Sequence, residues 1–124
     1  MAQRGWGRVV NVGSVNQQWP KQSVTVYGAA KAATSNLMVS LGRQYAQQGV
    51  LLNTVAPGLI DTYPENREGD AAAEQAWDDY AAQLNWMGRA GQPQEVVGAA
   101  LYLASPACSF MSGESLFVTG GFPN

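Results

Sequence analysis

The sequence contains no histidine, and that absence excludes several kinds of chemistry at once. A mechanism that needs an imidazole base, or a metal site built on imidazole ligands, has no residue to use. The single cysteine, Cys108, cannot form a disulfide within the chain, and no basic residue near it in sequence indicates a nucleophile. We therefore expect no metal site and a structural role for Cys108.

Charge is also scarce, since only 13% of the 124 residues are charged and the formal net charge is -2. A nucleic-acid surface needs clustered Lys and Arg, and the seven basic residues here are scattered. No apolar run approaches the roughly 18 residues of a membrane span, and the first residues lack the apolar segment of a signal peptide. We expect a cytoplasmic protein that binds neither nucleic acid nor membranes.

What the chain does have is apolar content, which reaches 46% of its residues. This length and composition suit one globular domain, and we expect residues 1–124 to form it. Few charges are available to solvate the surface of so small a domain. We therefore expect another copy of the chain to cover part of that surface, in a homo-oligomer such as a dimer or tetramer.

The first half of the chain reads as strand, helix, strand. Residues 7–13 are a β-branched run between glycines, which predicts a parallel strand buried on both faces. Residues 26–48 predict a helix and residues 50–55 a second buried strand, so the three form a βαβ unit. Apolar residues that recur every three or four positions predict the buried face of the helix: Ala30, Ala33, Leu37, Leu41 and Tyr45.

The second half predicts two more helices and one strand. Residues 71–85 are rich in alanine, residues 93–104 begin with a proline suited to a first helical turn, and residues 116–119 read as a strand. Seven of the nine acidic residues lie between positions 61 and 79, which we expect to be a solvated surface. Three aromatic residues could line a pocket or lie in a helix core: Trp77, Tyr80 and Trp86.

Three side chains in the first half could transfer a proton together. Tyr27 and Lys31 are four residues apart and so share one face of the predicted helix. Ser14 follows the first strand, at the carboxyl end where open α/β sheets bind their ligands. Such a group could reduce a carbonyl or oxidise an alcohol, although each residue alone could also be an ordinary loop or helix residue.

Four blocks of sequence resemble the C-terminal half of the classical short-chain dehydrogenase/reductase family, in that family's order and spacing. They are residues 7–14 (GRVVNVGS), 27–31 (YGAAK), 53–62 (NTVAPGLIDT) and 118–121 (VTGG), and the match covers nearly the whole chain. The resemblance implies an α/β fold with a partial Rossmann-like, doubly wound parallel sheet. It implies the last three strands and their helices, without the N-terminal dinucleotide-binding half.

The resemblance also implies roles for individual residues and a cofactor, NAD or NADP. Tyr27 would be the general acid or base, Ser14 would hold the substrate oxygen, and Lys31 would bind the nicotinamide ribose and stabilise the phenolate. Four residues would lie against the nicotinamide carboxamide: Pro57, Gly58, Ile60 and Thr62. Ionising a phenol at neutral pH costs on the order of 4 kcal/mol, so we expect the chemistry to depend on the positive charge of bound cofactor.

The 124 residues contain no glycine-rich turn between a strand and a helix, which is the element that holds a cofactor pyrophosphate. We therefore expect the chain alone to bind neither NAD nor NADP and to catalyse no hydride transfer. Two alternatives remain open. Another chain could supply the N-terminal half of a split reductase, or the protein could be a non-enzymatic assembly module. In the second case the strand at residues 7–13, which we expect to be an uncovered apolar edge without that half, would recruit a partner.

Overall fold

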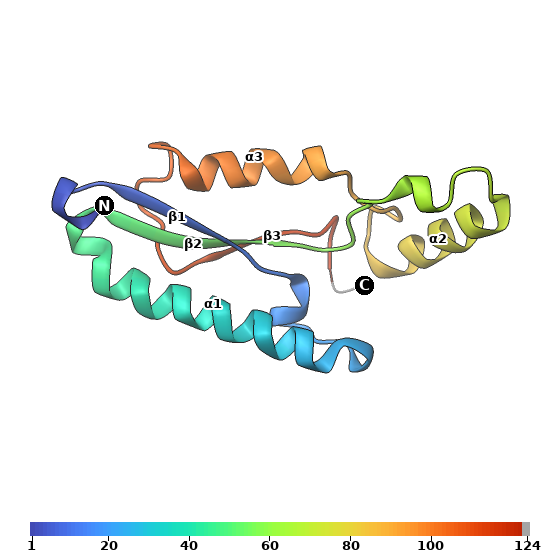
Figure 1. The fold of residues 1–124 in the computed structure, drawn as a ribbon, viewed down its shortest axis with the longest axis horizontal. Helices are drawn as coiled ribbons and strands as arrows, with labels where there is room; N and C mark the ends of the chain where they lie inside the picture. Colours follow the sequence, from blue (N-terminus) through green and yellow to red (C-terminus); the bar gives the residue numbers. More distant parts are fainter. Residues whose placement is uncertain (123–124) are drawn as a thin grey trace.

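The computed structural model describes residues 1–122, which form a three-stranded parallel sheet between helices (Figure 1). The strands are β1 (Gly7–Val12), β2 (Val50–Pro57) and β3 (Ser115–Val118), and they lie in the order β1-β2-β3. Both pairs are parallel, with Val12 opposite Val55 in the first. The partial Rossmann-like sheet predicted from the sequence is confirmed.

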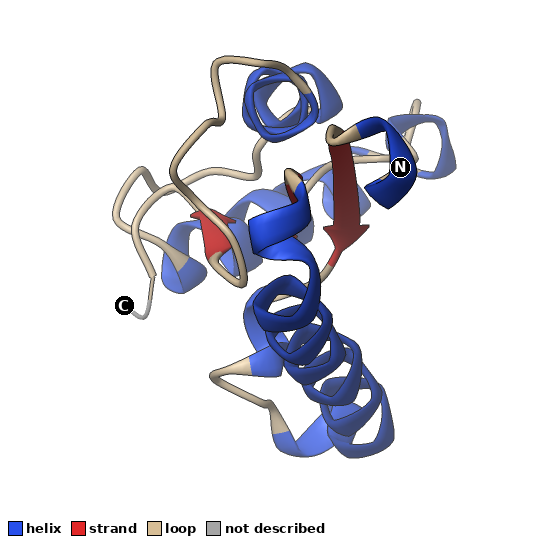
Figure 2. Ribbon diagram, turned by 90° about the vertical axis from the view of Figure 1, so that its left-hand side faces the viewer, coloured by secondary structure: helices blue, strands red, loops and turns tan. Residues whose placement is uncertain are grey.

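The two faces of the sheet are covered by different helices. Helix α1 (Thr25–Tyr45) lies on one face and α3 (Pro93–Ala104) on the other, while α2 (Ala71–Leu84) stands apart beyond the carboxyl end of the sheet (Figures 1 and 2). No helix within residues 1–122 is long and apolar enough to cross a membrane. Short 3-10 helices complete the structure: Ala2–Arg4, Val15–Gln17, Gln22–Val24, Ala46–Gln48 and Pro64–Asn66.

The core lies on both sides of the central strand β2, because alternate residues of a strand face opposite sides of a sheet. Leu52 packs with Met38 of α1 on one face. Val55 packs with Leu103 of α3 and with Cys108 on the other face. Cys108 is a fully buried free thiol, which agrees with the structural role expected for it.

Strand β1 is less buried than the sequence predicted. It pairs with β2 on one side only within residues 1–122, and four of its six side chains are half-buried. Val12, at its carboxyl end, is 60% exposed. The sequence correctly predicted a parallel strand, and without the N-terminal half of the family fold it correctly predicted a strand at the edge of the sheet. Full burial of both faces was wrong, because α1 packs mainly on β2 and leaves the adjacent face of β1 partly open.

Helix α1 uses only the C-terminal part of the predicted face to pack on the sheet, through Leu41 and Tyr45. Three of the five residues in the predicted stripe are exposed: Ala30, Ala33 and Leu37. The buried residues are Gly28, Met38 and Gly42. A Cβ atom at Gly28 would lie 3.1 Å from the Asn16 carbonyl oxygen, and one at Gly42 would lie 2.9 Å from the Ser112 hydroxyl. The helix approaches its neighbours through glycines, which apolar periodicity does not count.

Candidate active site

The carboxyl ends of β1 and β2 open into a cleft of about 470 Å³. Such strand ends are where open α/β sheets bind ligands. All seven residues nominated from the sequence line this cleft: Ser14, Tyr27, Lys31, Pro57, Gly58, Ile60 and Thr62. The structure therefore brings them together, while the role of each remains a prediction. Within residues 1–122, no group of three or more His, Cys, Asp or Glu side chains is arranged to bind a metal.

Lys31 is held between the end of β1 and the ring of Tyr27. Its ammonium nitrogen donates a hydrogen bond of 2.8 Å to the carbonyl oxygen of Val12. The same nitrogen lies 5.7 Å from the centroid of the Tyr27 ring, which is within the range of a cation–π contact. Tyr27 is 46% exposed and lines the cleft. The geometry fixes a positive charge beside a solvent-accessible phenol.

Ser14 is buried at the start of the 3-10 helix that follows β1. Its hydroxyl accepts a hydrogen bond of 3.2 Å from the backbone nitrogen of Asn16, as an N-cap residue does. No acceptor for the Ser14 hydroxyl proton is found among residues 1–122. A substrate oxygen in the cleft could therefore accept that proton.

Gln17 holds the Ser14 turn against the rest of the fold, and the sequence interpretation missed it. Its amide nitrogen donates to the hydroxyls of Ser35 at 3.0 Å and Ser115 at 2.8 Å, so it joins α1 and β3. Its amide oxygen accepts from the backbone nitrogen of Ser14 at 3.2 Å. A Cβ atom at Gly13 would overlap that oxygen. The spacing Ser-x-x-Gln, typical of a capping box, is the signal that could have identified it.

The turn after β2 is clamped from two sides. The backbone nitrogen of Gly58 donates to the carbonyl of Val118 in β3 at 2.9 Å. Gly91 donates to the carbonyl of Leu59 at 2.9 Å and accepts from the nitrogen of Asp61 at 2.8 Å, which forms an isolated bridge. These bonds fix the backbone on which the predicted nicotinamide contacts stand.

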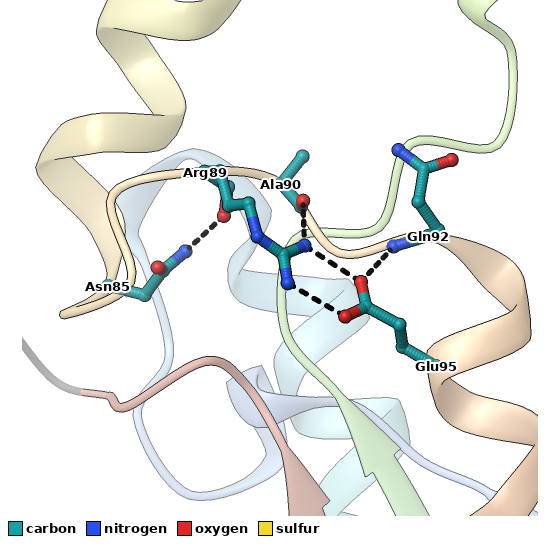
Figure 3. Close-up of polar contacts among 5 residues, drawn as sticks. All are labelled: Asn85, Arg89, Ala90, Gln92 and Glu95. Carbon is teal, nitrogen blue, oxygen red and sulfur yellow. Dashed lines mark hydrogen bonds and ion pairs between the residues drawn. The ribbon is translucent and has the colours of Figure 1, made fainter.

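An ion pair holds the segment that leads into α3 (Figure 3). Arg89 binds both carboxylate oxygens of Glu95, at 2.7 and 2.8 Å, and Glu95 also accepts from the backbone nitrogen of Gln92 at 2.8 Å. The Asn85 side chain donates to the Arg89 carbonyl at 2.8 Å. The hydrogen bonds from Arg89, followed by that from Gln92, lower the pKa of Glu95 to about 2.

A second cavity, of about 240 Å³, adjoins the cleft and shares four lining residues with it: Ser14, Tyr27, Gly58 and Leu59. Its other walls come from the loop after β1, from α2 and from the segment after β3. Lys21 and Tyr80 meet at this cavity, where the lysine nitrogen donates to the phenol oxygen at 2.9 Å. The cavity extends from Tyr27 to this pair.

Of the three aromatic residues left open between pocket and core, only Tyr80 lines the second cavity. Trp77 is half-buried beneath Arg67, whose guanidinium carbon lies 4.5 Å from the ring centroid. Arg67 also binds Asp61 at 2.7 Å and Glu74 at 3.4 Å, so the acidic segment is partly tied together rather than wholly solvated. Trp86 is 74% exposed, outside any helix core.

Comparison with known proteins identifies the family. A family model described as Enoyl-(Acyl carrier protein) reductase matches residues 1–123. A 3-oxoacyl-(acyl-carrier-protein) reductase from Vibrio harveyi is 39% identical over 98% of this chain and 48% of its own. The gluconate 5-dehydrogenase of Gluconobacter oxydans (strain 621H) is 35% identical over 98% of this chain and 46% of its own. The chain thus spans about half the length of the curated relatives it matches.

Solved structures give the same assignment. A 3-oxoacyl (acyl-carrier-protein) reductase from Agrobacterium tumefaciens C58, with NADP bound, superimposes with a TM-score of 0.91 at 56% identity, over 98% of this chain and 47% of that one. A gluconate 5-dehydrogenase from Burkholderia cenocepacia J2315, in complex with NADP and tartrate, gives 0.83 at 34% identity, over 96% and 46%. Together with the family model and the partial Rossmann-like fold, these matches show that the chain belongs to the short-chain dehydrogenase/reductase family.

Proposed function

We propose that the cleft is the nicotinamide end of an active site that interconverts a ketone and a secondary alcohol with NADP. The observation that carries the proposal is the Lys31 nitrogen, which is bonded to the carboxyl end of β1 and lies beside the exposed Tyr27 phenol. Ser14 lines the same cleft. NADP is favoured over NAD because the Agrobacterium and Burkholderia relatives were solved with NADP bound.

The residues of the cleft suit a nicotinamide nucleotide. Its volume lies within the roughly 300–1,000 Å³ of ordinary ligand sites. No Asp or Glu lines it, so nothing in its walls repels a phosphate-bearing ligand. Lys31 and Thr62 would offer polar contacts to the cofactor, and Pro57, Gly58 and Ile60 would offer an apolar wall. When bound, a reduced nicotinamide supplies the hydride that turns the carbonyl carbon into a carbinol carbon.

The protein's own residues handle the proton. Ser14 donates a hydrogen bond to the carbonyl oxygen and orients it. Tyr27 gives its hydroxyl proton to that oxygen as negative charge develops there, which leaves a phenolate. The Lys31 ammonium, whose nitrogen lies 5.7 Å from the centroid of the Tyr27 ring, stabilises the phenolate. In the oxidative direction the same phenolate removes the alcohol proton.

The pyrophosphate end of the cofactor needs more than these residues. The 124 residues contain no glycine-rich turn that opens a helix, which is the usual cradle for that group. We infer that they bind NADPH weakly by themselves. Turnover would then require a dinucleotide-binding half, either on the same polypeptide or on a separate chain.

The test is to join residues 1–124 to the N-terminal half of the Agrobacterium relative, which is 56% identical over the shared part. Calorimetry should detect micromolar NADPH binding by the joined protein and weaker binding by the 124 residues alone. The joined protein should oxidise NADPH in the presence of short ketones. A joined protein that folds and binds NADPH but oxidises none with any ketone tested would contradict the catalytic proposal, and micromolar binding by the 124 residues alone would contradict the weak-binding proposal.

A second candidate function, assembly with another chain, is favoured by exposed apolar side chains. On α1, Val26 is 84% and Leu37 53% exposed. An open apolar hollow of about 190 Å³ lies beside β1 and the end of α1, and it is lined by Met1, Ala2, Val9, Tyr45, Val50 and Leu52. Surfaces of this kind mark protein–protein contacts.

Sedimentation of the 124-residue protein tests the assembly candidate. We expect a dimer or tetramer that Leu37→Glu dissociates, because a carboxylate at the contact would be buried without a partner. Asn36→Glu is the matched control, since Asn36 is exposed on the same helix. A monomeric wild-type protein would contradict self-association. Mixing it with a full-length relative would then test whether the two proteins form mixed oligomers.

A further inference from the structure

Each of the two lysines of the chain lines one of the two adjoining cavities. Lys31 lines the larger cleft and Lys21 the smaller cavity, whereas none of the five arginines lines either one. In a chain of net charge -2, this gathers the lysine charge at one site. In the proposed reaction Lys31 stabilises the phenolate of Tyr27. Lys21 has no role in that reaction.

Lys21 is held in place rather than free in solvent. Its ammonium nitrogen donates to the Tyr80 hydroxyl at 2.9 Å and lies 5.1 Å from the centroid of that ring. The lysine comes from the loop after β1 and the tyrosine from α2, so the contact joins two walls of the smaller cavity. Within residues 1–122, Lys21 forms no ion pair.

The Lys21–Tyr80 contact leaves two donors available to a ligand. An ammonium has three N–H groups, of which one binds Tyr80. The Tyr80 oxygen accepts that bond, so its own proton can be donated elsewhere. Two adjacent donors, one of them charged, match the two oxygens of a carboxylate. No Asp or Glu lines the cavity to neutralise the lysine from within the chain.

The rest of the cavity limits the size of the ligand. About 240 Å³ is below the roughly 300–1,000 Å³ of drug-sized sites, so the cavity by itself suits a small ligand. Leu84 and Phe122 supply apolar walls, and Ser14 and Tyr27 close the end shared with the larger cleft. A phosphate dianion is less suited, because one lysine supplies only one positive charge.

We propose that the substrate is a small oxo acid, or the corresponding hydroxy acid, whose carboxylate binds Lys21 and Tyr80. Its carbonyl then lies at Ser14 and Tyr27, at the opposite end of the same cavity. Lys21 is the specificity-determining residue. This inference rests on the proposed function for the identity of the reacting group, but carboxylate binding itself needs no cofactor.

The experiment uses the 124-residue protein without cofactor and measures dissociation constants from NMR shifts. The probes are 2-, 3- and 4-oxopentanoate, which vary the distance between the two groups, each beside its neutral primary amide. We expect at least one acid to bind about tenfold more tightly than its amide, since charged hydrogen bonds are stronger than neutral ones. Lys21→Met should abolish that preference. Arg43→Met, which removes an exposed positive charge outside both cavities, should retain it.

Two outcomes overturn the inference: equal affinity for every acid and its amide, including no binding of either, or an acid preference that survives Lys21→Met. The result is separable from the proposed function. Suppose that Lys21→Met loses the acid preference, but the protein joined to a cofactor-binding half shows no turnover. The carboxylate site would then be supported and the reductase proposal would be contradicted. Turnover by the joined protein without any acid preference would support the reductase proposal and contradict the carboxylate site.

Discussion

Two Lys–Tyr pairs flank the connected cavities, and they differ in which part of the phenol the lysine meets. Lys31 and Tyr27 lie one turn apart on α1, with the lysine nitrogen 5.7 Å from the ring centroid and bonded to the carbonyl of Val12. Lys21 and Tyr80 come from different elements, and the lysine nitrogen bonds the hydroxyl directly at 2.9 Å. The first arrangement leaves the Tyr27 hydroxyl available for proton transfer. The second makes two donors suited to holding an anion.

The pairs also stand on different supports. The first pair stands on α1, which packs against β1 and β2 in the core of the fold. The second joins a loop to α2, which stands beyond the sheet (Figure 1). Regions with little packing open at lower free-energy cost than core elements do. We therefore expect the proton-transfer pair to be rigid and the anion-binding pair to move as substrate enters.

Replacing each of the two tyrosines by phenylalanine should produce the largest difference in turnover, and it should distinguish the roles of the two pairs. In the joined protein, Tyr27→Phe should reduce NADPH oxidation by about 10²- to 10⁴-fold, because general acid catalysis is lost. Tyr80→Phe should retain the chemistry and weaken the preference for oxo acids over amides. Absorbance at 340 nm measures both. Equal losses of turnover in the two variants would contradict the separate roles given to Tyr27 and Tyr80.

Lys31→Met should come next in size. We expect turnover to fall by roughly 10²-fold, because the phenolate left on Tyr27 loses its neighbouring positive charge. Lys21→Met is the matched variant, since it removes the same charge from the other pair. It should raise the KM for the acid and leave the maximal rate with the amide unchanged. A Lys31→Met enzyme with wild-type turnover would contradict the role given to Lys31.

Gln17 ties the Ser14 turn to α1, which carries Tyr27 and Lys31, and this tie can be weakened without changing either residue. Gln17→Leu removes the bonds to Ser35 and Ser115 and the bond from the Ser14 backbone. At roughly 1 kcal/mol for each hydrogen bond, urea unfolding should show a loss of about 2–3 kcal/mol. Gln18→Leu is the control, because Gln18 is exposed and adjacent. A similar loss in both variants would mean that the Gln17 bonds add little.

The smallest effect is expected at Glu95, on the opposite side of the turn that follows β2. Its pKa is lowered from 4.5 to about 2 by Arg89 and Gln92, so its contribution to stability is complete above about pH 4.5 and is lost as pH falls toward 2. Glu95→Gln should make the urea midpoint less dependent on pH over that window. Glu68→Gln, at an exposed residue outside the ion pairs of residues 1–122, should leave that dependence as it is.

The regular elements could be predicted from sequence because their signals are local. The β-branched runs predicted β1 and β2, and the proline at residue 93 marked the first turn of α3. The seven cleft residues could be nominated because four motif blocks fixed their positions by resemblance. Those motifs place Ser14 just after β1 and Pro57 at the end of β2, and the carboxyl ends of neighbouring parallel strands lie at one edge of the sheet.

Other features depend on contacts between distant residues, so the sequence interpretation missed them. The packed face of α1 is built on Gly28 and Gly42, which have no side chain to reveal a pattern. Lys21 gains its partner from a residue 59 positions later in the chain, and Gln17 reaches Ser115 across 98 positions. No spacing rule predicts such pairs, although the capping-box spacing could have drawn attention to Gln17.

The most direct test of the proposed nicotinamide site is magnetisation transfer in the joined protein, with isotope-labelled methyl groups in residues 1–124. Saturation of the nicotinamide protons of bound NADPH should reach the methyl groups of Ile60 and Thr62, which line the cleft with Tyr27 and Lys31. It should not reach Met1 or Leu52, in the apolar hollow beside β1. Transfer to Ile60 and Thr62 supports the account. Saturating NADPH that gives no transfer to either methyl would contradict it.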